Sequence, residues 1–189
     1  MVRRLVVAAL AALCATTAVP AQAAAPVKLY LNQGATCADG AMWVITPIAD
    51  DSGGCVIIPR TMVNGEGLDN TSEAFATSKK NKTYTIDAKK PLTGTFALFG
   101  SSGLTLSNAP AYVAADFTVK VAKKTIGTVR VEGPALPTLP ATKTFSLKLP
   151  ANLNKVKSNS VQVNVQWVTC VGLCGVAVSG TSFLNLPVR

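Results

Sequence analysis

The sequence predicts an all-β protein, a two-sheet antiparallel β-sandwich of jelly-roll or immunoglobulin-like type with about ten to twelve short strands. Three observations predict it. Hydrophobic residues make up 49% of the chain and charged residues only 14%, with Thr, Ser, Asn, Val and Ala taking up the difference, as in pleated strands and tight turns. Period-two alternation recurs along the chain while helical periodicity is nearly absent. Turn residues separate the alternating segments.

The N-terminal segment has the three parts of a secretory signal peptide. Arg3 and Arg4 give a positive start, Leu5 to Val19 is an uncharged apolar run, and Ala21-Gln22-Ala23 is a small-x-small end. The apolar run is shorter than the roughly 20 residues that a membrane helix needs. We therefore expect a cleaved signal peptide at 1–23, a secreted single domain at 24–189, and no transmembrane segment in the mature chain. A twin-arginine signal and a lipoprotein cysteine at Cys14 are the alternatives.

The strands follow one another in a regular order. Residues 160–168 alternate most cleanly and place Trp167 with three valines on the core face. Gly127 predicts a bulge, Lys123-Lys124 predicts a turn tip, and the three prolines within 133–140 predict a stiff connector. The expected strands are 27–31, 41–45, 55–58, 83–88, 92–99, 104–107, 112–122, 126–131, 144–149, 160–168, 175–179 and 182–186.

One segment, residues 60–82, lacks a strand pattern. We expect a long irregular loop there, with a single helical turn at 72–78. Glu66, Asp69 and Asn70 offer oxygen ligands and are the candidate calcium site, although they lack the regular spacing of a Ca²⁺-binding loop. Asp50-Asp51 is a second candidate, or simply a polar turn. No cofactor is expected other than a structural calcium ion at these residues.

Four cysteines remain beyond residue 23, and an even number in an exported chain predicts two disulfides. Three pairings are possible. Cys37–Cys55 with Cys170–Cys174 is preferred because each ring is short, and Gly172 between the second pair suits a clamp across a hairpin turn. A four-thiolate zinc site is the alternative.

Charge is distributed unevenly along the chain. The formal net charge is +9. Residues 24–78 contain six acids and two bases, whereas residues 79–189 contain three acids and fourteen bases. Such asymmetry suits an anionic partner, such as a cell-wall polymer or a membrane surface, or it merely places lysines on solvent faces and sheet edges. Nearly all the bases are lysines and only 6% of residues are aromatic, which argues against a nucleic-acid partner.

The second half carries turn-and-strand patterns seen in a known group of domains. These are Leu92-Thr93-Gly94, Phe117 to Val121, Gly127-Thr128-Val129, Phe145 to Leu153, and Gly180 to Pro187. In them the segment from Leu92 to Pro187 resembles secreted bacterial jelly-roll domains, the carbohydrate-binding-module and galactose-binding-like sandwiches appended to exported hydrolases and proteases. The resemblance implies the fold. It also implies glycan binding through exposed aromatic rings and a structural calcium ion, and neither feature is matched to residues of this chain.

The chemistry open to the chain is limited because it contains no histidine. That excludes a Ser-His-Asp triad, a Cys-His pair and histidine-based metal sites. A pair of carboxylates, as in glycoside hydrolysis, is the catalysis that remains, and no such pair is evident. We therefore expect a secreted non-catalytic binding or structural module, acting at the cell surface or in the medium on a glycan or an anionic cell-wall polymer.

The candidate ligand platforms are aromatic rings, because sugars stack on them. They are Trp43, Tyr30, Tyr84 and Tyr112. Two other hypotheses stay open. The first is a protein-binding module such as a protease inhibitor, presenting residues 55–62 or the proline connector as a rigid loop. The second is a carboxylate-based hydrolase.

Overall fold

A computed structural model describes residues 24–32, 43–46, 72–77, 82–101, 110–136, 138–170, 173–178 and 180–189. Several predictions fall outside these ranges. They concern the signal peptide at 1–23 with Cys14, the strands at 55–58 and 104–107, the pair Cys37–Cys55, Asp50-Asp51, and the calcium candidates Glu66, Asp69 and Asn70.

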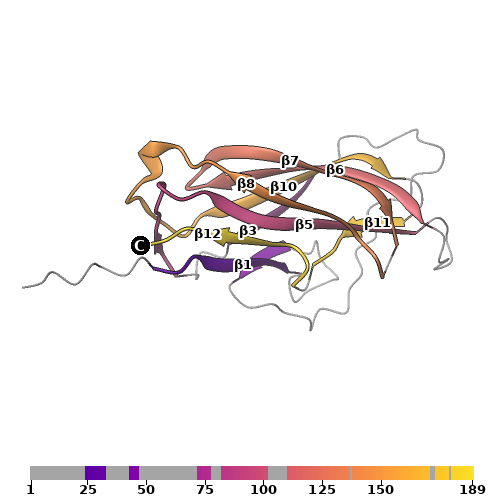
Figure 1. Cartoon of the computed structure of the whole chain (residues 1–189), viewed down its shortest axis with the longest axis horizontal. Coiled ribbons are helices and arrows are strands. Elements are labelled where there is room, and N and C mark those ends of the chain that lie inside the picture. Colours follow the sequence, from indigo (N-terminus) through magenta and orange to yellow (C-terminus); the bar gives the residue numbers. More distant parts are fainter. Residues whose placement is uncertain are drawn as a thin grey trace, which may run out of the picture.

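The described residues form an all-β sandwich, as the sequence predicts (Figure 1). The only other regular element among them is a 3-10 turn, η1 (Ala151–Leu153). The strands are β1 (Val27–Asn32), β2 (Trp43–Thr46), β3 (Ser72–Thr77), β4 (Tyr84–Thr85), β5 (Leu92–Ser101), β6 (Ala111–Val121), β7 (Lys124–Ala135), β8 (Ala141–Leu147), β9 (Lys157–Ser158), β10 (Val161–Cys170), β11 (Leu173–Val176) and β12 (Phe183–Leu186).

The strands lie in two layers. One layer has the order β8-β5-β12-β1, with β11 pairing the far end of β5, and the other has the order β2-β3-β10-β6-β7. Strand β1 pairs with β12 on one side and β2 on the other, and so joins the layers. All these pairings are antiparallel except β2 with β3, which is parallel. In the described residues β7 pairs only with β6 and β8 only with β5, so the seam between β7 and β8 is open.

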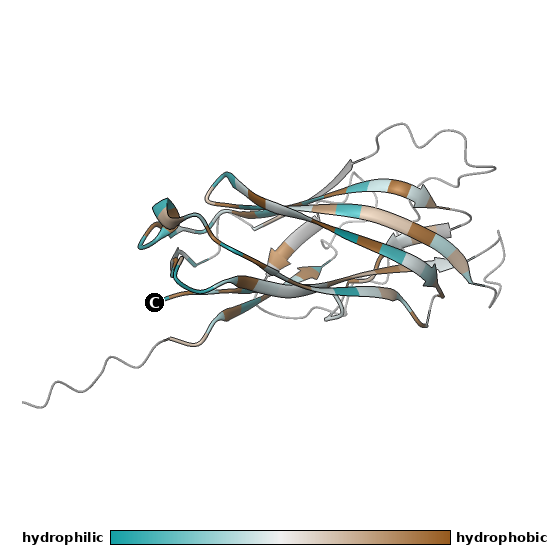
Figure 2. Cartoon of the chain, turned by 45° about the horizontal axis from the view of Figure 1, so that its top comes forward, coloured by the Kyte–Doolittle hydropathy of each residue, from teal (hydrophilic) through white to brown (hydrophobic). Residues whose placement is uncertain are grey.

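The core lies between the layers and is built from the inward-facing residue of each alternating pair. Figure 2 shows the alternation as short hydrophobic and hydrophilic bands along the strands. Phe96 of β5 stacks on Phe117 of β6 with ring centroids 4.4 Å apart, and on Phe145 of β8 at 4.6 Å. Since Phe117 belongs to the opposite layer, these rings hold the two sheets together. Trp167 is 4% exposed, which confirms its assignment to the core.

Two predictions about local structure are wrong. The helical turn expected at 72–78 is instead strand β3, which pairs with β10 through residues 72–76 and buries Phe75 completely. The irregular segment therefore contains a strand. The proline connector was expected to begin at Gly133, yet β7 runs to Ala135 and includes Pro134. Proline is tolerated there because β7 is an edge strand and its outer edge needs no N–H donor.

The predicted bulge at Gly127 is confirmed. Val119 of β6 faces Gly127 and Lys120 faces Thr125, so Ile126 is an extra residue on β7. The turn before β7 is made by Ala122 and Lys123, one residue earlier than expected.

The disulfide Cys170–Cys174 is present and buried, but it does not clamp a hairpin. Strand β10 pairs with β3 and β6, whereas β11 pairs with β5. The disulfide therefore links a strand of one layer to a strand of the other. It lies at the end of the sandwich where β10 and β5 finish, opposite the end that holds the C-terminus (Figure 1).

Candidate functional site

The end of the sandwich that holds the C-terminus is built from four separate stretches of chain. They are residues 82–91, residues 122–124 at the β6–β7 turn, residues 148–160, and residues 187–189. Hydrogen bonds tie them together. Strand β4 pairs with β9, and Ile86 bridges Val188. The backbone N–H of Ala122 donates to the carbonyl of Ser160 at 2.8 Å.

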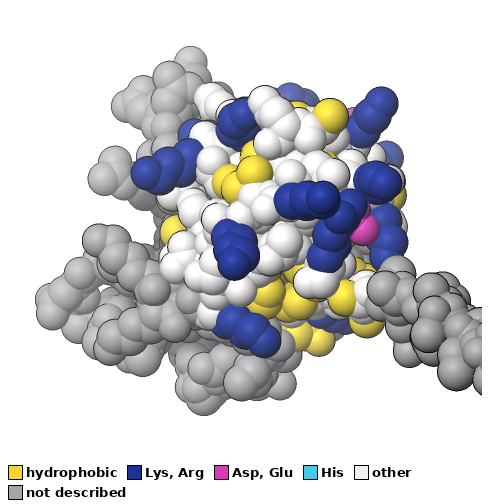
Figure 3. Space-filling view, turned by 90° about the vertical axis from the view of Figure 1, so that its left-hand side faces the viewer, with side chains coloured by type: hydrophobic (Ala, Val, Ile, Leu, Met, Phe, Trp, Pro, Cys, Tyr) yellow, Lys and Arg dark blue, Asp and Glu magenta, His cyan; other side chains and the backbone are white. Residues whose placement is uncertain are grey.

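Nine of the described basic residues lie in these four stretches. All but Lys90 are exposed, and Figure 3 shows lysine and arginine side chains spread over this end, with few acidic ones in view. We call it the basic end, and its bases are Lys82, Lys89, Lys90, Lys123, Lys124, Lys148, Lys155, Lys157 and Arg189.

Asp87 is the one acid that the described residues contribute to the basic end. Its carboxylate lies 3.5 Å from Nε of Arg189, whose guanidinium also donates to the Asn154 side chain at 3.2 Å. Throughout the described part of the chain, no lysine forms an ion pair with a carboxylate. Lysines close together and without acidic partners create a positive potential that reaches beyond the surface.

A small pocket of about 260 Å³ opens in the basic end. Lys123 comes to it from the β6–β7 turn, Lys157 from β9, and Thr83 from the chain before β4. The remaining lining residues are Ala122, Ser158, Asn159 and Ser160. None of the described residues that line the pocket is an acid.

The turn that carries Lys123 has an uncommon backbone. Ala122 and Lys123 have φ angles of 49° and 66°, the left-handed region that a two-residue type I′ turn requires. Asn-Gly is the usual choice there, because other residues lose about 1–2 kcal/mol in that conformation. Lys155, also at the basic end, has a φ of 66°. Lysines thus occupy two positions where glycine or asparagine would be more stable.

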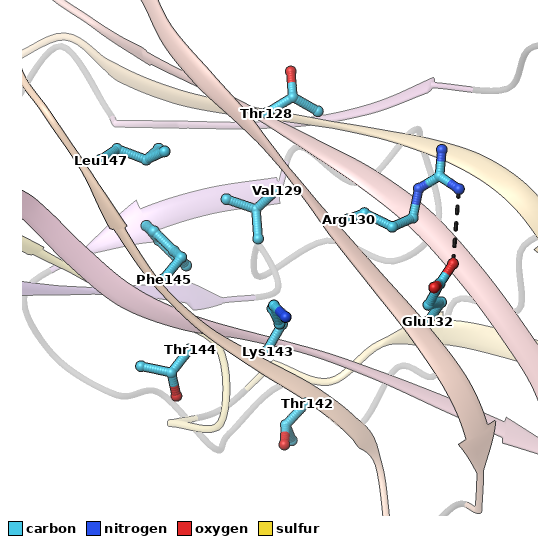
Figure 4. Close-up of a pocket in the computed structure, with 9 residues that line it drawn as sticks. All are labelled: Thr128, Val129, Arg130, Glu132, Thr142, Lys143, Thr144, Phe145 and Leu147. Carbon is cyan, nitrogen blue, oxygen red and sulfur yellow. Dashed lines mark ion pairs between the residues drawn. The ribbon is translucent and has the colours of Figure 1, made fainter.

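A second hollow, a groove of about 660 Å³, lies in the seam between β7 and β8 (Figure 4). Its apolar wall comes from Val129, Phe145 and Leu147. Lys143 also lines it, at an inward-facing position of β8 where the seam leaves the side chain exposed. Threonine hydroxyls from both strands complete the lining.

The charged rim of this groove belongs to a ladder across β6 and β7. Arg130 donates from Nε and from a terminal nitrogen to the two carboxylate oxygens of Asp116, at 2.5 and 2.7 Å. A third guanidinium nitrogen lies 3.8 Å from Glu132. The bidentate contact holds the pKa of Asp116 below its ordinary value, because hydrogen bonding favours the charged carboxylate and outweighs the opposing effect of burial.

The candidate aromatic platforms lie on four different strands, β1, β2, β4 and β6, and the three whose side chains are described differ in exposure. Tyr112 is 51% exposed on β6 and offers its ring to solvent, whereas Tyr84 is 9% exposed and offers no platform. Tyr30 is partly buried, and its ring is covered by the Lys28 ammonium at 5.0 Å. Trp43 is placed in β2, but its side chain lies outside the description.

No group of three or more His, Cys, Asp or Glu side chains that could hold a metal ion occurs in the described residues. Within the same ranges, no helix is long and apolar enough to cross a membrane. Searches of the chain against protein-family models, curated protein sequences and solved structures found no match.

Sequence reasoning missed the residues of the basic end as a site. It recorded the fourteen bases beyond residue 78 but singled out none of them. The excess of bases over acids beyond residue 78 was the signal in the sequence for this site. Only the pairing of the strands shows that four stretches of chain bring these bases to one end.

Proposed function

We propose that this chain is an exported, non-catalytic binding module that attaches to an anionic cell-wall polymer through its basic end. The observation that carries the proposal is the convergence of nine bases and a single, arginine-paired acid at that end of the described sandwich. A polymer with repeated negative charge is attracted to such a surface over about one Debye length, roughly 8 Å at physiological salt.

Two further observations support binding to a polymer. The bases are lysines with one arginine, and lysine is a mobile point charge suited to repeated anionic groups. The signal-peptide pattern at 1–23 and the resemblance of Leu92 to Pro187 to exported jelly-roll binding domains both suit action outside the membrane.

Binding is favoured over hydrolysis by the surroundings of the three acids whose side chains the structure describes. Asp87, Asp116 and Glu132 each lie beside an arginine, Arg189 or Arg130. A glycosidase instead needs two carboxyl groups facing one another across a substrate cleft.

The test is co-sedimentation of the exported chain with cell-wall fragments that carry a phosphodiester polymer, at 50 to about 300 mM salt. We expect binding that weakens steeply as salt rises. The triple variant Lys89→Gln, Lys124→Gln and Lys148→Gln should bind about tenfold more weakly, roughly 0.5 kcal/mol per lysine. Lys143→Gln, in the seam groove, is the control and should bind within about 1.3-fold of wild type. Binding that does not weaken as salt rises, or an equal loss of affinity per substituted lysine in the two variants, would refute the proposal.

A second candidate function, protein binding, is favoured by one residue. Leu139 of the proline connector is 69% exposed, and the loop behind it is closed by a hydrogen bond from the N–H of Leu136 to the carbonyl of Leu139. A protruding leucine on a stiff loop is the form that a protease inhibitor presents. A panel of serine proteases assayed with micromolar protein decides this, and absence of inhibition removes the candidate.

A further inference from the structure

The small pocket at the basic end has the size and lining of an anion site. Its volume of about 260 Å³ equals roughly eight water molecules at ~30 Å³ each. That is enough for one phosphate-sized group with a few waters. Three side-chain hydroxyls, two ammonium groups and one amide line it.

The two cations of the pocket come from different elements of the fold. Lys123 stands on the β6–β7 turn and Lys157 on β9, and both side chains are exposed with no carboxylate partner in the described residues. An ammonium group has three donors and no preferred plane, and binds phosphate as a point charge. A lone carboxylate would be better matched by the planar fork of an arginine, and none of the described lining residues is an arginine.

The hydroxyls add neutral donors. Ser158 Oγ accepts a hydrogen bond of 3.0 Å from the N–H of Ser160, so its own proton stays available for an anion. Thr83 lies beside β4, on the strand pair that also holds Ser158, and its side chain is exposed. The hydroxyl and ammonium donors therefore come from three separate stretches of chain, 83, 122–123 and 157–160.

The walls are fixed by bonds that do not involve the pocket's side-chain donors. Besides the Ala122–Ser160 bond, Thr77 Oγ1 of β3 accepts from the N–H of Val161 at 3.0 Å and donates to the carbonyl of Asn159. Tyr84 and Ser158 are paired in the β4–β9 ladder. A site assembled before binding loses less entropy when it captures its ligand.

We infer that this pocket binds one phosphate group, with Lys123 and Lys157 neutralising its charge and the hydroxyls of Thr83, Ser158 and Ser160 donating to its oxygens. The inference rests on the proposed function and makes it more specific, because it names phosphodiester as the repeating anionic group of the polymer. Lysines outside the pocket then attract the polymer by its charge, and the pocket distinguishes phosphate from other anionic groups.

The experiment is an NMR titration of the ¹⁵N-labelled exported chain with inorganic phosphate at constant ionic strength, with acetate as the comparison anion. We expect saturable amide shifts confined to residues 83, 122–123 and 157–160, with a dissociation constant on the order of 1 mM for phosphate. Acetate should bind at least about fivefold more weakly.

Two double variants with the same loss of charge provide the decisive comparison. Lys123→Gln with Lys157→Gln removes the pocket cations, and Lys89→Gln with Lys148→Gln removes two exposed lysines of the basic end that do not line the pocket. The first should weaken phosphate binding by about tenfold or more, and the second by less than about twofold. Unchanged ¹⁵N spectra away from the substitutions establish that both variants are folded.

The outcomes separate this inference from the proposed function. Equal losses in the two variants, shifts scattered over the basic end, or no saturation would overturn the phosphate site, while salt-dependent wall binding would still uphold the function. Saturable phosphate binding without any wall binding would uphold the site and overturn the function.

Discussion

The β6–β7 turn offers the sharpest test of the structure, because its backbone conformation disagrees with its residues. Ala122 and Lys123 both have positive φ angles. Replacing them by Asn and Gly, Ala122→Asn with Lys123→Gly, installs the pair that a type I′ turn favours. We expect the protein to become more stable, although an exposed lysine is lost.

The magnitude follows from two opposing terms at Lys123. Relief of the left-handed conformation gains about 1–2 kcal/mol, and the extra freedom of glycine in the unfolded chain costs about 0.5–1 kcal/mol. Asparagine at Ala122 adds a smaller gain because it tolerates this region better than alanine. The net stabilisation is about 1 kcal/mol, or a rise of roughly 2–4 °C in Tm for a chain of this size.

The assay is urea unfolding followed by circular dichroism, with Lys124→Gly as the matched control. Lys124 is the next exposed lysine, and its φ is not positive, so glycine there should destabilise by about 0.5–1 kcal/mol. Opposite signs for the two changes support the described turn. Destabilisation by both would show that Lys123 is not held in the left-handed region. The variant with Ala122→Asn and Lys123→Gly should also bind phosphate more weakly. The substitution that relieves the left-handed backbone also removes a lysine of the phosphate pocket, so stability is gained at the cost of binding.

Three other predictions concern the sandwich itself. The buried indole N–H of Trp167 has no hydrogen-bond partner among the described residues, so Trp167→Phe should cost less than about 1.5 kcal/mol in urea unfolding. Trp167→Ala should cost about 3–5 kcal/mol, and similar costs for both substitutions would contradict the burial of an unpaired donor. Because Arg130 lowers the pKa of Asp116, the ion pair stabilises the fold fully at pH values above the pKa of Asp116 in the unfolded chain. This stabilisation is lost as the pH falls through the lower pKa of Asp116 in the folded chain. Asp116→Asn should therefore reduce stability by less than about 1 kcal/mol at pH 7 and by progressively less as the pH falls through the folded pKa, and a loss that does not change with pH would be inconsistent with an ionic origin. Replacing Cys170 and Cys174 by alanine should lower the unfolding free energy by about 2 kcal/mol, as expected for a ring near five residues, and an unaffected urea midpoint would speak against the disulfide's role.

Strands that are regular in sequence are the ones that sequence reasoning placed well. In β10, Val161, Val163 and Val165 are all buried, as their alternation predicts. Strand β3 was missed because Ser72–Thr77 shows only one large apolar residue, Phe75, and its strand character comes from pairing with β10 and β2. Partners distant in sequence cannot be seen in a local pattern.

The same limit applied to the disulfide and to the site. Proximity in sequence paired Cys170 with Cys174, but it could not show that β10 and β11 belong to different layers. The charge count located the bases beyond residue 78, yet Lys123 and Lys157 become neighbours only through the pairing of β4 with β9 and the bond from Ala122 to Ser160. The prediction that Tyr84 offers an aromatic platform was wrong for a related reason. The burial of its ring depends on which residues pack over it in the fold, and a local sequence pattern does not show this.

The separation of the basic end from the disulfide end gives the described sandwich an electric dipole along its strands. In the field of a polyanion such a dipole turns the molecule before contact, so that it arrives with its strands pointing at the polymer. The opposite end then faces outward and carries Leu139, Tyr112 and Val168, the exposed large apolar side chains of the described residues. A molecule tethered in this way would stand upright on the wall and present that outer end to whatever approaches from the medium.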